Sequence, residues 1–424
     1  MRTTDNRNRY QLVLGLMFVA ASAIFILAVH YFGLETEVVR GYFPYADELM
    51  RGSMPETEYP PFALVFFALP RLFADTAFGY NIMFVAEAVV FFIIGLVVTG
   101  KLAKRYNHSP NKAMLIYTIF MLLMLEFVVD RYDIFPVVLT LLSFYCFVTK
   151  RYVWAFVLLS IATMTKLYPA VLFPIYLIPF VMNRDWPNAL KGTCVFILVA
   201  ALIVLPFALL WPDAGFSFLT YHMDRPLHLE SVAASFIHLT SVFGLNDVSI
   251  AFSYGSDNLI GPWPDTVASY LTPLMLMSLF LVYAFYTYRL SISRKEKYDN
   301  ENSRMVLLGW AALLSLLAFI TIGKVFSTQY IVWMIPFIVF MQMTTIDHVV
   351  KNNILVLSVI VIILSQLNFA VNVGLCGGGE NVTDAGMMIL LARNILVILL
   401  FAYVIWACKK GIYRKLWPGR SADT

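Results

Sequence analysis

Apolar segments long enough to cross a lipid bilayer recur along almost the whole chain, and this pattern limits the possible folds more than any other feature. A transmembrane helix needs about 20 apolar residues, or fewer where the bilayer is thin. Only 13% of the 424 residues are charged, against roughly 25% in soluble proteins. A single soluble core cannot account for this, because its exterior would still need polar cover. The sequence therefore predicts an all-α, polytopic transmembrane helical bundle.

Twelve spans are predicted where apolar runs are set against polar breaks. They cover residues 12–32, 81–100, 113–129, 134–149, 152–165, 169–182, 192–210, 268–288, 305–322, 329–343, 353–370 and 386–406. Residues 62–73 form a further apolar run, but it is short, follows Pro60 and Pro61, and contains Pro70. The residues after the first span offer no small-residue cleavage pattern, so we expect a membrane helix there and not a cleavable signal peptide.

The distribution of basic residues predicts which loops face the cytoplasm, because cytoplasmic loops are enriched in Lys and Arg. If the run 62–73 does not cross and the N-terminus is inside, 22 of the 30 basic residues lie on the cytoplasmic side. Of the 26 acidic residues, 19 then lie outside or within spans. If the run did cross, the basic clusters would face outward. We therefore expect twelve spans with cytoplasmic N and C termini, and the run 62–73 at the outer face.

Two long segments on the predicted outer side, residues 33–80 and 211–267, are where we expect the chemistry, because long loops in a compact protein usually carry function. Shorter polar turns on the same side cover residues 126–133, 166–169, 323–329 and 371–385. The chain 1–424 is expected to form a single membrane domain. In it, residues 33–80 would carry catalytic carboxylates and short interfacial helices.

The first outer segment contains six carboxylates within 24 residues, directly after a membrane span. Residues 42–50 fit a short amphipathic helix, with Tyr42, Tyr45 and Leu49 along one stripe. Glu37 and Asp47 lie close to the membrane beside aromatic residues, which makes them the candidates for function. A solvated loop with ordinary charges is the alternative for all six.

The turn 126–133 places further charges between two spans. Ionisable groups at membrane depth are costly, so they tend to be paired or functional. An Asp130–Arg131 pair that caps the turn is the structural alternative. Asp133 directly precedes the next span, and it is either a helix N-cap or a functional residue. Glu87 and Arg393 lie within spans, where interhelical pairing explains them best.

Three cations, Lys166, Arg225 and Lys324, stand apart on the predicted outer face. Together with His222 they suit a lipid-linked phosphate, which needs charge neutralisation and hydrogen-bond donors. Snorkelling alone explains many boundary lysines. The expected phosphate site therefore rests on all three cations lying on one face, beside a cluster of carboxylates.

Several motifs occur in one order across the chain. They are Tyr42-Phe-Pro-Tyr45-Ala46 with Gly52, Glu58-Tyr59-Pro-Pro61, Arg131-Tyr-Asp133-Ile-Phe-Pro136, Lys166-Leu-Tyr-Pro169, Arg225-Pro-Leu-His-Leu-Glu230-Ser231, and Gly323-Lys-Val-Phe-Ser-Thr-Gln329-Tyr-Ile-Val-Trp333. This ordered set resembles the integral-membrane glycosyltransferases of the GT-C class, and most of all glycosyltransferase family 87. That family contains polyprenyl-phosphate-mannose-dependent mannosyltransferases.

The resemblance implies a GT-C fold in the plasma membrane and transfer of a sugar, with mannose favoured, from a polyprenyl phosphate to a lipid or glycan acceptor on the extracytoplasmic face. It implies a general-base carboxylate in the first outer loop, inversion at the anomeric carbon, and expulsion of the lipid phosphate. The family's base is an Asp shortly before the tyrosine that matches Tyr42. That position is Val38 here, and the spacing before Glu58 is shorter than usual. Glu37 is therefore our first choice for the base and Asp47 our second.

The resemblance also suggests roles for the other polar residues of these motifs. The donor phosphate would be bound by Lys166, Arg225, Lys324 and His222. The substrate would be positioned by Glu58, Tyr59, Asp133, Glu230 and Gln329.

No cofactor is expected, and we predict metal-independent transfer, because the outer loops lack a D-x-D motif and no Rossmann-type Gly-rich turn occurs. The four cysteines, Cys146, Cys194, Cys376 and Cys408, lack metal-ligand spacing. A nucleic-acid partner is excluded because no basic stripe is present.

The main alternatives are a lipid flippase or transporter and a polymerase or ligase of polyprenyl-linked glycans. A transporter would predict internal repeats and broken helices near the midplane. No repeated half is visible, and the polar groups gather at one face. An intramembrane channel fits less well, since few charges lie within the spans. The acceptor stays open between a phosphatidylinositol mannoside, another lipoglycan and a surface protein, and the sugar between mannose and arabinofuranose.

Overall fold

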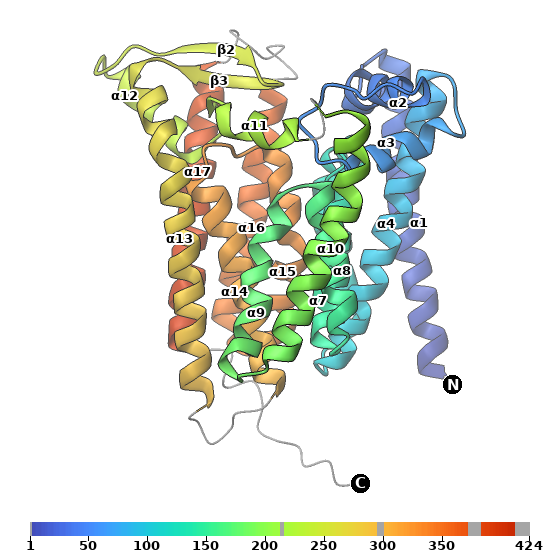
Figure 1. Ribbon diagram of the computed structural model, residues 1–424, viewed down its shortest axis with the longest axis vertical. Helices are drawn as coiled ribbons and strands as arrows, with labels where there is room; N and C mark the ends of the chain where they lie inside the picture. Colours follow the sequence, from blue (N-terminus) through green and yellow to red (C-terminus); the bar gives the residue numbers. More distant parts are fainter. Residues whose placement is uncertain (1, 213–215, 295–300, 372–382, 412–424) are drawn as a thin grey trace. The chain divides into compact units, whose positions relative to one another are not determined.

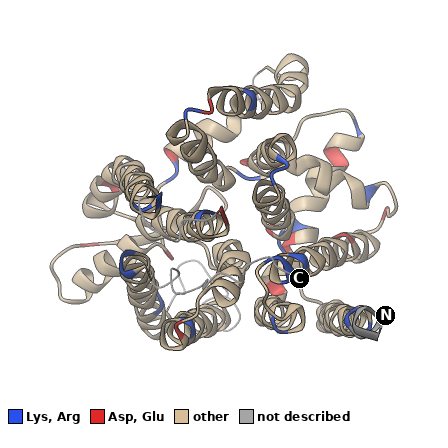
Figure 2. Cartoon of the chain, turned by 90° about the horizontal axis from the view of Figure 1, so that it is seen from below, with Lys and Arg blue, Asp and Glu red and all other residues tan. Residues whose placement is uncertain are grey.

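A computed structural model describes residues 2–212, 216–294, 301–371 and 383–411. The chain forms two compact units, which we call unit 1 (Met1–Met223) and unit 2 (Asp224–Thr424). Both are built almost entirely from helices (Figure 1). Seven helices in the described parts are long and apolar enough to cross a membrane. Lys, Arg, Asp and Glu occupy few positions on these helices, which Figure 2 draws mostly in tan. The prediction of an all-α polytopic membrane protein is therefore confirmed in its coarse form.

Unit 1 is a helical bundle with short helices between its long ones. It contains α1 (Arg2–Phe32), the π-helical turn η1 (Val38–Tyr42), α2 (Phe43–Met50), α3 (Ala63–Arg71), α4 (Ala77–Arg105), α5 (Pro110–Leu123), α6 (Leu125–Val129), α7 (Ile134–Val148), α8 (Tyr152–Thr165), the 3₁₀ turn η2 (Tyr168–Leu172), α9 (Phe173–Met182), α10 (Trp186–Leu210) and most of α11 (Ser217–Asp224). Helix α8 packs on α7 and α10, and α4 packs on α5 and α7.

Unit 2 combines long helices with a small sheet. It contains β1 (Leu227–His228), α12 (Val232–Val242), β2 (Ser249–Ser253), β3 (Ser256–Ile260), α13 (Pro262–Arg294), α14 (Glu301–Ile322), the 3₁₀ turn η3 (Thr328–Tyr330), α15 (Ile331–Thr344), α16 (His348–Phe369) and α17 (Asp384–Lys410). The turn predicted at 371–385 lies mostly outside the described residues, as does Cys376.

Each of the twelve ranges predicted as spans falls on one helix or on consecutive helices. The range 113–129 is divided at Met124, where α5 ends and α6 follows. The range 169–182 starts as the 3₁₀ turn η2 before it becomes α9. The range 329–343 likewise starts in the 3₁₀ turn η3 before α15 begins. The apolar runs therefore located the helices, while the breaks inside these three runs were not predicted.

Capping residues explain several helix boundaries. Thr76 accepts a hydrogen bond from the backbone N–H of Gly79 at 3.1 Å and so begins α4. Ser109 caps α5, and Pro110 stands at the first position, where the missing N–H costs nothing. Gly411 ends α17 in the left-handed region at φ 67°.

The short apolar run 62–73 forms α3, a helix of nine residues that is too short to span a bilayer. It packs against α2 and α4. The ring of its buried Phe67 stacks on Tyr42 at 4.3 Å, and its backbone carbonyl accepts a hydrogen bond from the Tyr80 hydroxyl. Figure 1 shows α2 and α3 at the end of α1 that lies away from the N-terminus.

A three-stranded antiparallel sheet in unit 2, with strand order β1-β3-β2, was not predicted. Tyr254 and Gly255 connect β2 to β3 with φ values of 52° and 64°, as in the hairpin turns that match strand twist. Leu227 pairs with Leu259, and both belong to a buried apolar cluster that also contains Leu271 of α13 and residues of α12 and α17. The sheet is therefore fixed to the ends of these helices.

Replacing Gly192 by Ala is expected to lower the thermal stability of the purified protein. A Cβ at Gly192 on α10 would overlap the buried Phe156 ring of α8, and overpacking typically costs about 1–3 kcal/mol. Gly15→Ala on α1 is the matched control, because nothing lies within 4 Å of its Cβ and Ala is the better helix former. Thermal unfolding in detergent compares the two. Equal stability of both variants would contradict the close contact between α8 and α10.

Candidate active site

Glu37 of unit 1 is bound by two arginines. Its Oε2 lies 3.0 Å from Arg131 Nη1 and 2.9 Å from Arg40 Nη2. The carboxylate folds over Gly41, where an added Cβ would lie 3.0 Å from Glu37 Oε1. The absence of a side chain at Gly41 therefore leaves room for the carboxylate at the start of η1.

The protonation of Glu37 follows from these two contacts. Burial would raise its pKa, but the charges and hydrogen bonds of Arg131 and Arg40 outweigh burial and lower the pKa below its ordinary value. Arg131 in turn stays positively charged, because Glu37, Tyr42 and Asp130 raise its pKa although burial acts in the opposite direction. Glu37 is therefore a carboxylate at neutral pH.

Asp130 connects the turn 126–133 to the segment 33–80. Its Oδ1 accepts a hydrogen bond from the backbone N–H of Val38 at 3.2 Å. Burial raises the pKa of Asp130 to about 6, although Arg131 and this backbone contact lower it. The charges of Asp130 and Arg131 act on each other, while the ion pair that the structure shows for Arg131 is made with Glu37.

Four rings, Tyr42, Tyr59, Phe67 and Tyr132, form what we call the aromatic cluster. Tyr42 stacks on Phe67, and the ring centroids of Tyr59 and Tyr132 lie 4.8 Å apart. Burial raises the pKa of both Tyr42 and Tyr59, so these phenols stay protonated. The charges of Arg131, Glu37 and other carboxylates also act on Tyr42. The cluster therefore lies next to the ionised groups and provides an apolar wall for them.

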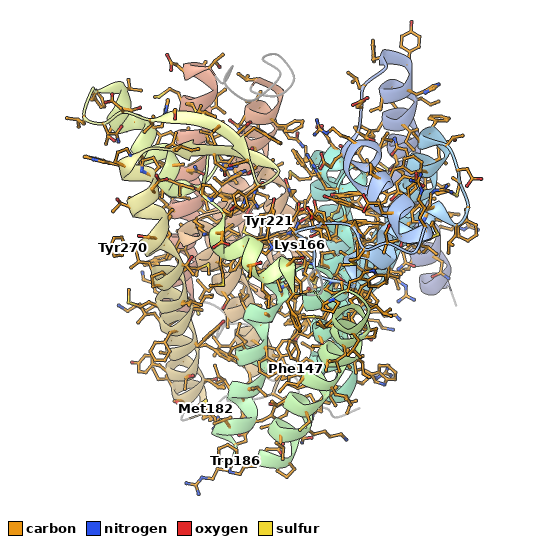
Figure 3. All side chains as sticks on the ribbon, turned by 45° about the horizontal axis from the view of Figure 1, so that its top comes forward. Phe147, Lys166, Met182, Trp186, Tyr221 and Tyr270 are labelled. Atoms are coloured by element: carbon orange, nitrogen blue, oxygen red, sulfur yellow. The ribbon has the colours of Figure 1, made fainter. Side chains whose placement is uncertain are left out.

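Lys166 and Asp133 form an ion pair at the edge of the aromatic cluster. Lys166 Nζ lies 2.7 Å from Asp133 Oδ1, and the Asp133 side chain is only 1% exposed. The ammonium also lies 4.5 Å from the centre of the Tyr132 ring. Burial lowers the pKa of Lys166, and Asp133 opposes this shift. Figure 3 shows Lys166 far from Met182 and Trp186, toward the opposite end of unit 1.

The alternative that Asp133 is the N-cap residue of the next helix is met in position but not in side-chain contact. Asp133 does occupy the N-cap position of α7, but its side chain makes no capping hydrogen bond. The carboxylate is directed to Lys166 instead, because a buried ammonium needs a close counter-charge. Glu58 is half-buried in the same region, and its charge acts on Lys166, Tyr45 and Tyr59.

Asp47, the second candidate base, binds Arg71 at the end of α3. Its Oδ1 lies 2.6 Å from Arg71 Nε, and Arg71 also pairs with Asp75. This group joins α2 to α3. The two predicted bases thus have different surroundings, and Glu37 is the one beside Arg131 and Tyr42.

In unit 2 the structure brings together two of the three predicted cations. Arg225 Nη2 donates to Ser256 Oγ on β3 at 2.7 Å. The backbone N–H of His228 donates to the carbonyl of Lys324 at 3.0 Å. Burial lowers the pKa of Lys324, Asp224 raises it, and the positive charge of Arg225 lowers it again. Arg225 and Lys324, with Asp224 as the one carboxylate beside them, form a positively charged region.

His228 was named only as part of a motif, and its role in packing was missed. It is buried, and its Nδ1 lies 3.1 Å from the carbonyl oxygen of Phe326. Burial and the charges of Arg225 and Arg393 lower its pKa well below the ordinary value, so the ring is neutral. His228 therefore joins the segment of Arg225 to the segment of Lys324.

Arg393 of α17 binds Glu230, and this changes the interpretation of both residues. The fully buried guanidinium lies 3.3 Å from Glu230 Oε2 and 2.5 Å from the Glu230 carbonyl oxygen. Thr328 donates to the same carboxylate at 2.9 Å, and the guanidinium lies over the Phe326 ring. Glu230 therefore fixes two loops to α17.

The prediction that both Arg393 and Glu87 form interhelical pairs is wrong in detail. The partner of Arg393 lies in the loop between β1 and α12, and not on another spanning helix. Glu87 Oε2 is buried on α4 without a hydrogen-bond partner among the described residues.

The last two predicted residues lie on α11 and in η3. His222 lies on α11, with its ring edge-on to Tyr221 at 5.8 Å. Gln329 is half-buried in η3, next to the buried Thr328. No group of three or more His, Cys, Asp or Glu residues that could hold a metal ion occurs in the described parts of the chain.

The candidate membrane spans place the chain among polytopic membrane proteins, and the Glu37 ion pairs give it a buried charged site. The sequence model of glycosyltransferase family 87 matches residues 57–319, which is more than half of the chain. The protein belongs to glycosyltransferase family 87, and the predicted resemblance is confirmed. A comparison with curated proteins found no significant match.

Arg393→Met is expected to destabilise the protein strongly. The substitution leaves Glu230 without its buried counter-charge, and breaking a buried pair costs about 3–5 kcal/mol. Arg40→Met is the matched control, because Arg40 is 67% exposed and exposed pairs contribute about 0–1 kcal/mol. Thermal unfolding measures both variants. A melting temperature of Arg393→Met equal to that of Arg40→Met would show that the Glu230 contact does not hold unit 2 together.

Proposed function

We propose that this membrane glycosyltransferase moves mannose from a polyprenyl-phosphate donor to a lipid or glycan acceptor on the outer face of the plasma membrane. The observation that carries the proposal is Glu37, a carboxylate kept ionised by Arg131 and Arg40 beside buried tyrosines, in a chain of family 87. We also propose the topology that puts this site outside. It has twelve spans in one membrane domain, cytoplasmic termini, and outer segments 33–80 and 211–267.

Glu37 is the proposed general base. The acceptor hydroxyl becomes more acidic as its oxygen bonds to the anomeric carbon, so a carboxylate with a low pKa can still take the proton in the transition state. The new C–O bond forms on the face opposite to the lipid phosphate. The bond to the phosphate breaks and its electron pair leaves with the phosphate oxygen, which inverts the configuration.

Arg225 and Lys324 are the proposed ligands of the donor phosphate. The positive charge of Arg225 disfavours the charged form of Lys324, and a bound phosphate would offset that repulsion. Lys166 and His222 are proposed as further phosphate contacts, for which Lys166 must share or leave Asp133. Tyr59, Glu58 and Gln329 are proposed to position the sugar and the acceptor.

Glu37→Gln is expected to lower sugar transfer by about 10²–10⁴-fold, the usual contribution of a general base. The assay uses membranes, radiolabelled polyprenyl-phosphate-mannose and endogenous lipid acceptors. Asp47→Asn is the matched variant, and it should keep most of the activity because Asp47 is bound to Arg71. Full activity in Glu37→Gln with an inactive Asp47→Asn would reverse the order of the two bases. Movement of label across the membrane without transfer would support a flippase.

The acidic limb of the pH–rate profile is expected to shift upward in Arg131→Gln. The base works when Glu37 is deprotonated, and its pKa lies below the ordinary 4.5, so the wild-type rate falls only at lower pH. Without Arg131, burial remains and raises the pKa, so activity is lost at higher pH. Arg40→Gln should shift the limb less, because Arg40 is exposed. Profiles of kcat/KM that coincide for wild type and Arg131→Gln would exclude Glu37 as the base.

Arg225→Ala combined with Lys324→Ala is expected to weaken donor binding by at least about tenfold, since a charge-assisted contact contributes about 1.5–3 kcal/mol. The measurement is the KM for the polyprenyl-phosphate donor. Lys191→Ala with Lys351→Ala removes two predicted cytoplasmic cations and serves as the control. An unchanged donor KM in the Arg225/Lys324 variant would overturn the phosphate assignment.

A further inference from the structure

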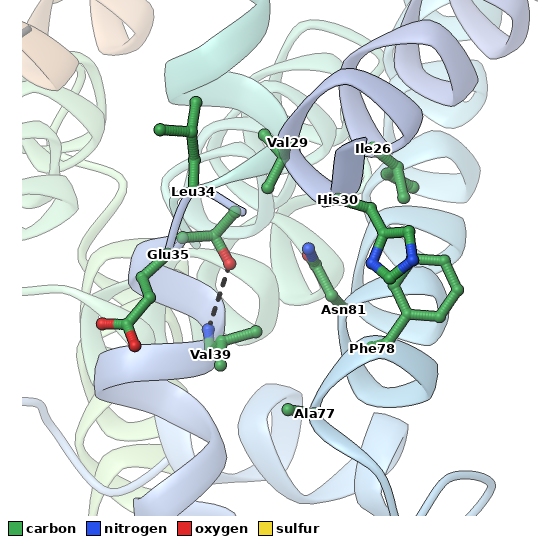
Figure 4. Close-up of a pocket in the computed structure, with 10 residues that line it drawn as sticks. Ile26, Val29, His30, Leu34, Glu35, Val39, Ala77, Phe78 and Asn81 are labelled. Carbon is green, nitrogen blue, oxygen red and sulfur yellow. Dashed lines mark hydrogen bonds between the residues drawn. The ribbon is translucent and has the colours of Figure 1, made fainter. Parts of the chain in front are cut away.

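A pocket in unit 1 lies beside the first outer segment and belongs to none of the contacts described so far. It is bordered by the end of α1, by residues 34–39 and by the start of α4. Its walls are mainly apolar, with Ile26, Val29, Leu34, Val39 and Phe78 among the lining residues. Figure 4 shows these side chains around the opening. The pocket therefore suits a hydrocarbon chain.

Asn81 is the polar group inside this pocket. Its side chain is directed into the space in Figure 4, and only 4% of the residue is exposed. No described residue forms a hydrogen bond with its amide, whereas the nearby Thr36 hydroxyl already accepts one from Val39 N–H. The Asn81 amide borders the pocket, so a ligand that fills the pocket and displaces water should supply a hydrogen bond to it. The amide is therefore suited to a hydrogen bond from a ligand that enters the pocket.

The surroundings of the pocket indicate where the ligand comes from. Helices α1 and α4 are both candidate membrane spans. On α1, Leu12, Leu16, Ile24 and Leu27 are each more than half exposed, as expected for a face in contact with lipid. The pocket lies where this helix ends, so the molecules available to it are bilayer lipids.

The charge around the pocket restricts which part of a lipid can enter. No Lys or Arg is found among the described residues that line it, and Glu35 and His30 are its titratable groups. His30 is in contact with the ring of Phe78, at 4.2 Å between ring centres. A phosphate would find no cationic partner here. The neutral upper part of an acyl chain, with its ester carbonyl, fits the walls and the Asn81 amide.

We propose that this pocket binds one acyl chain of a bilayer glycerophospholipid, whose ester carbonyl accepts a hydrogen bond from the Asn81 amide. The bound acyl chain contacts Val39 and lies next to Thr36. These two residues flank Glu37 and Val38. The bound lipid would therefore support the segment that carries the proposed base. The proposal depends on the membrane location and not on sugar transfer.

The test is photolabelling of the full chain in nanodiscs. The probe is a phosphatidylcholine with a diazirine near the ester end of one acyl chain, and the labelled residues are located by peptide mass spectrometry. We expect labelling concentrated on residues 26–39 and 77–81. Asn81→Leu keeps the apolar walls but removes the amide, and should reduce this labelling by roughly tenfold, as for loss of one buried hydrogen bond. An ether-linked probe without the carbonyl should label the wild type equally weakly.

Two further variants complete the test. Val29→Trp fills the pocket and should abolish the local labelling, whereas Leu16→Trp on the lipid-facing side of α1 should leave it unchanged. Labelling spread evenly along α1, or unchanged in both Asn81→Leu and Val29→Trp, would show ordinary surface lipid and overturn the proposal. The labelling needs no catalysis, so an absence of pocket labelling leaves the proposed glycosyl transfer standing. An inactive protein that still shows pocket labelling contradicts only the proposed transfer.

Discussion

Charge pairing in poorly hydrated surroundings is the interaction on which the rest of this structure depends. Glu37 binds Arg131, Asp133 binds Lys166, and Glu230 binds Arg393. Each pair joins segments that are far apart in the sequence. A buried charge without its partner is strongly destabilising, so these pairs determine which loops lie together as well as which groups stay ionised. The segments that carry these charges are therefore held in place by the same groups that give them chemical character.

The same kind of charge pairing distinguishes the surroundings of the two carboxylates proposed as the base, Glu37 and Asp47. Asp47 shares Arg71 with Asp75 and joins two short helices. Glu37 instead lies against Gly41, with Arg131 on one side and Tyr42 close by. Its low pKa keeps it deprotonated, and the arginines fix its direction. A carboxylate held in this way suits a reaction in which the acceptor hydroxyl loses its proton only as it attacks.

The sequence predicted the helices well and their partners poorly. Apolar runs and caps such as Ser109–Pro110 are local signals, so they located the spanning helices and the short helix α3. The contacts of Asp133 and Arg393 depend on residues 33 and 163 positions away, which no local pattern contains. The sheet was missed because its strands are short and partly polar, although Tyr254-Gly255 is a usable turn signal. Whether Glu37, Arg225 and Lys324 act on substrate stays a prediction.

The central claim, that paired charges keep Glu37 ionised, is tested most directly by isotope-edited infrared spectroscopy. Protein with ¹³C-labelled glutamate carboxyl groups is titrated in acid, and the spectrum of Glu37→Gln is subtracted to isolate this one carboxyl group. The account predicts that the Glu37 carboxylate band persists below pH 4.5, the ordinary pKa of Glu. In Arg131→Gln the band should disappear at a higher pH than in the wild type. Loss of the wild-type Glu37 carboxylate band already above pH 4.5 would contradict the account.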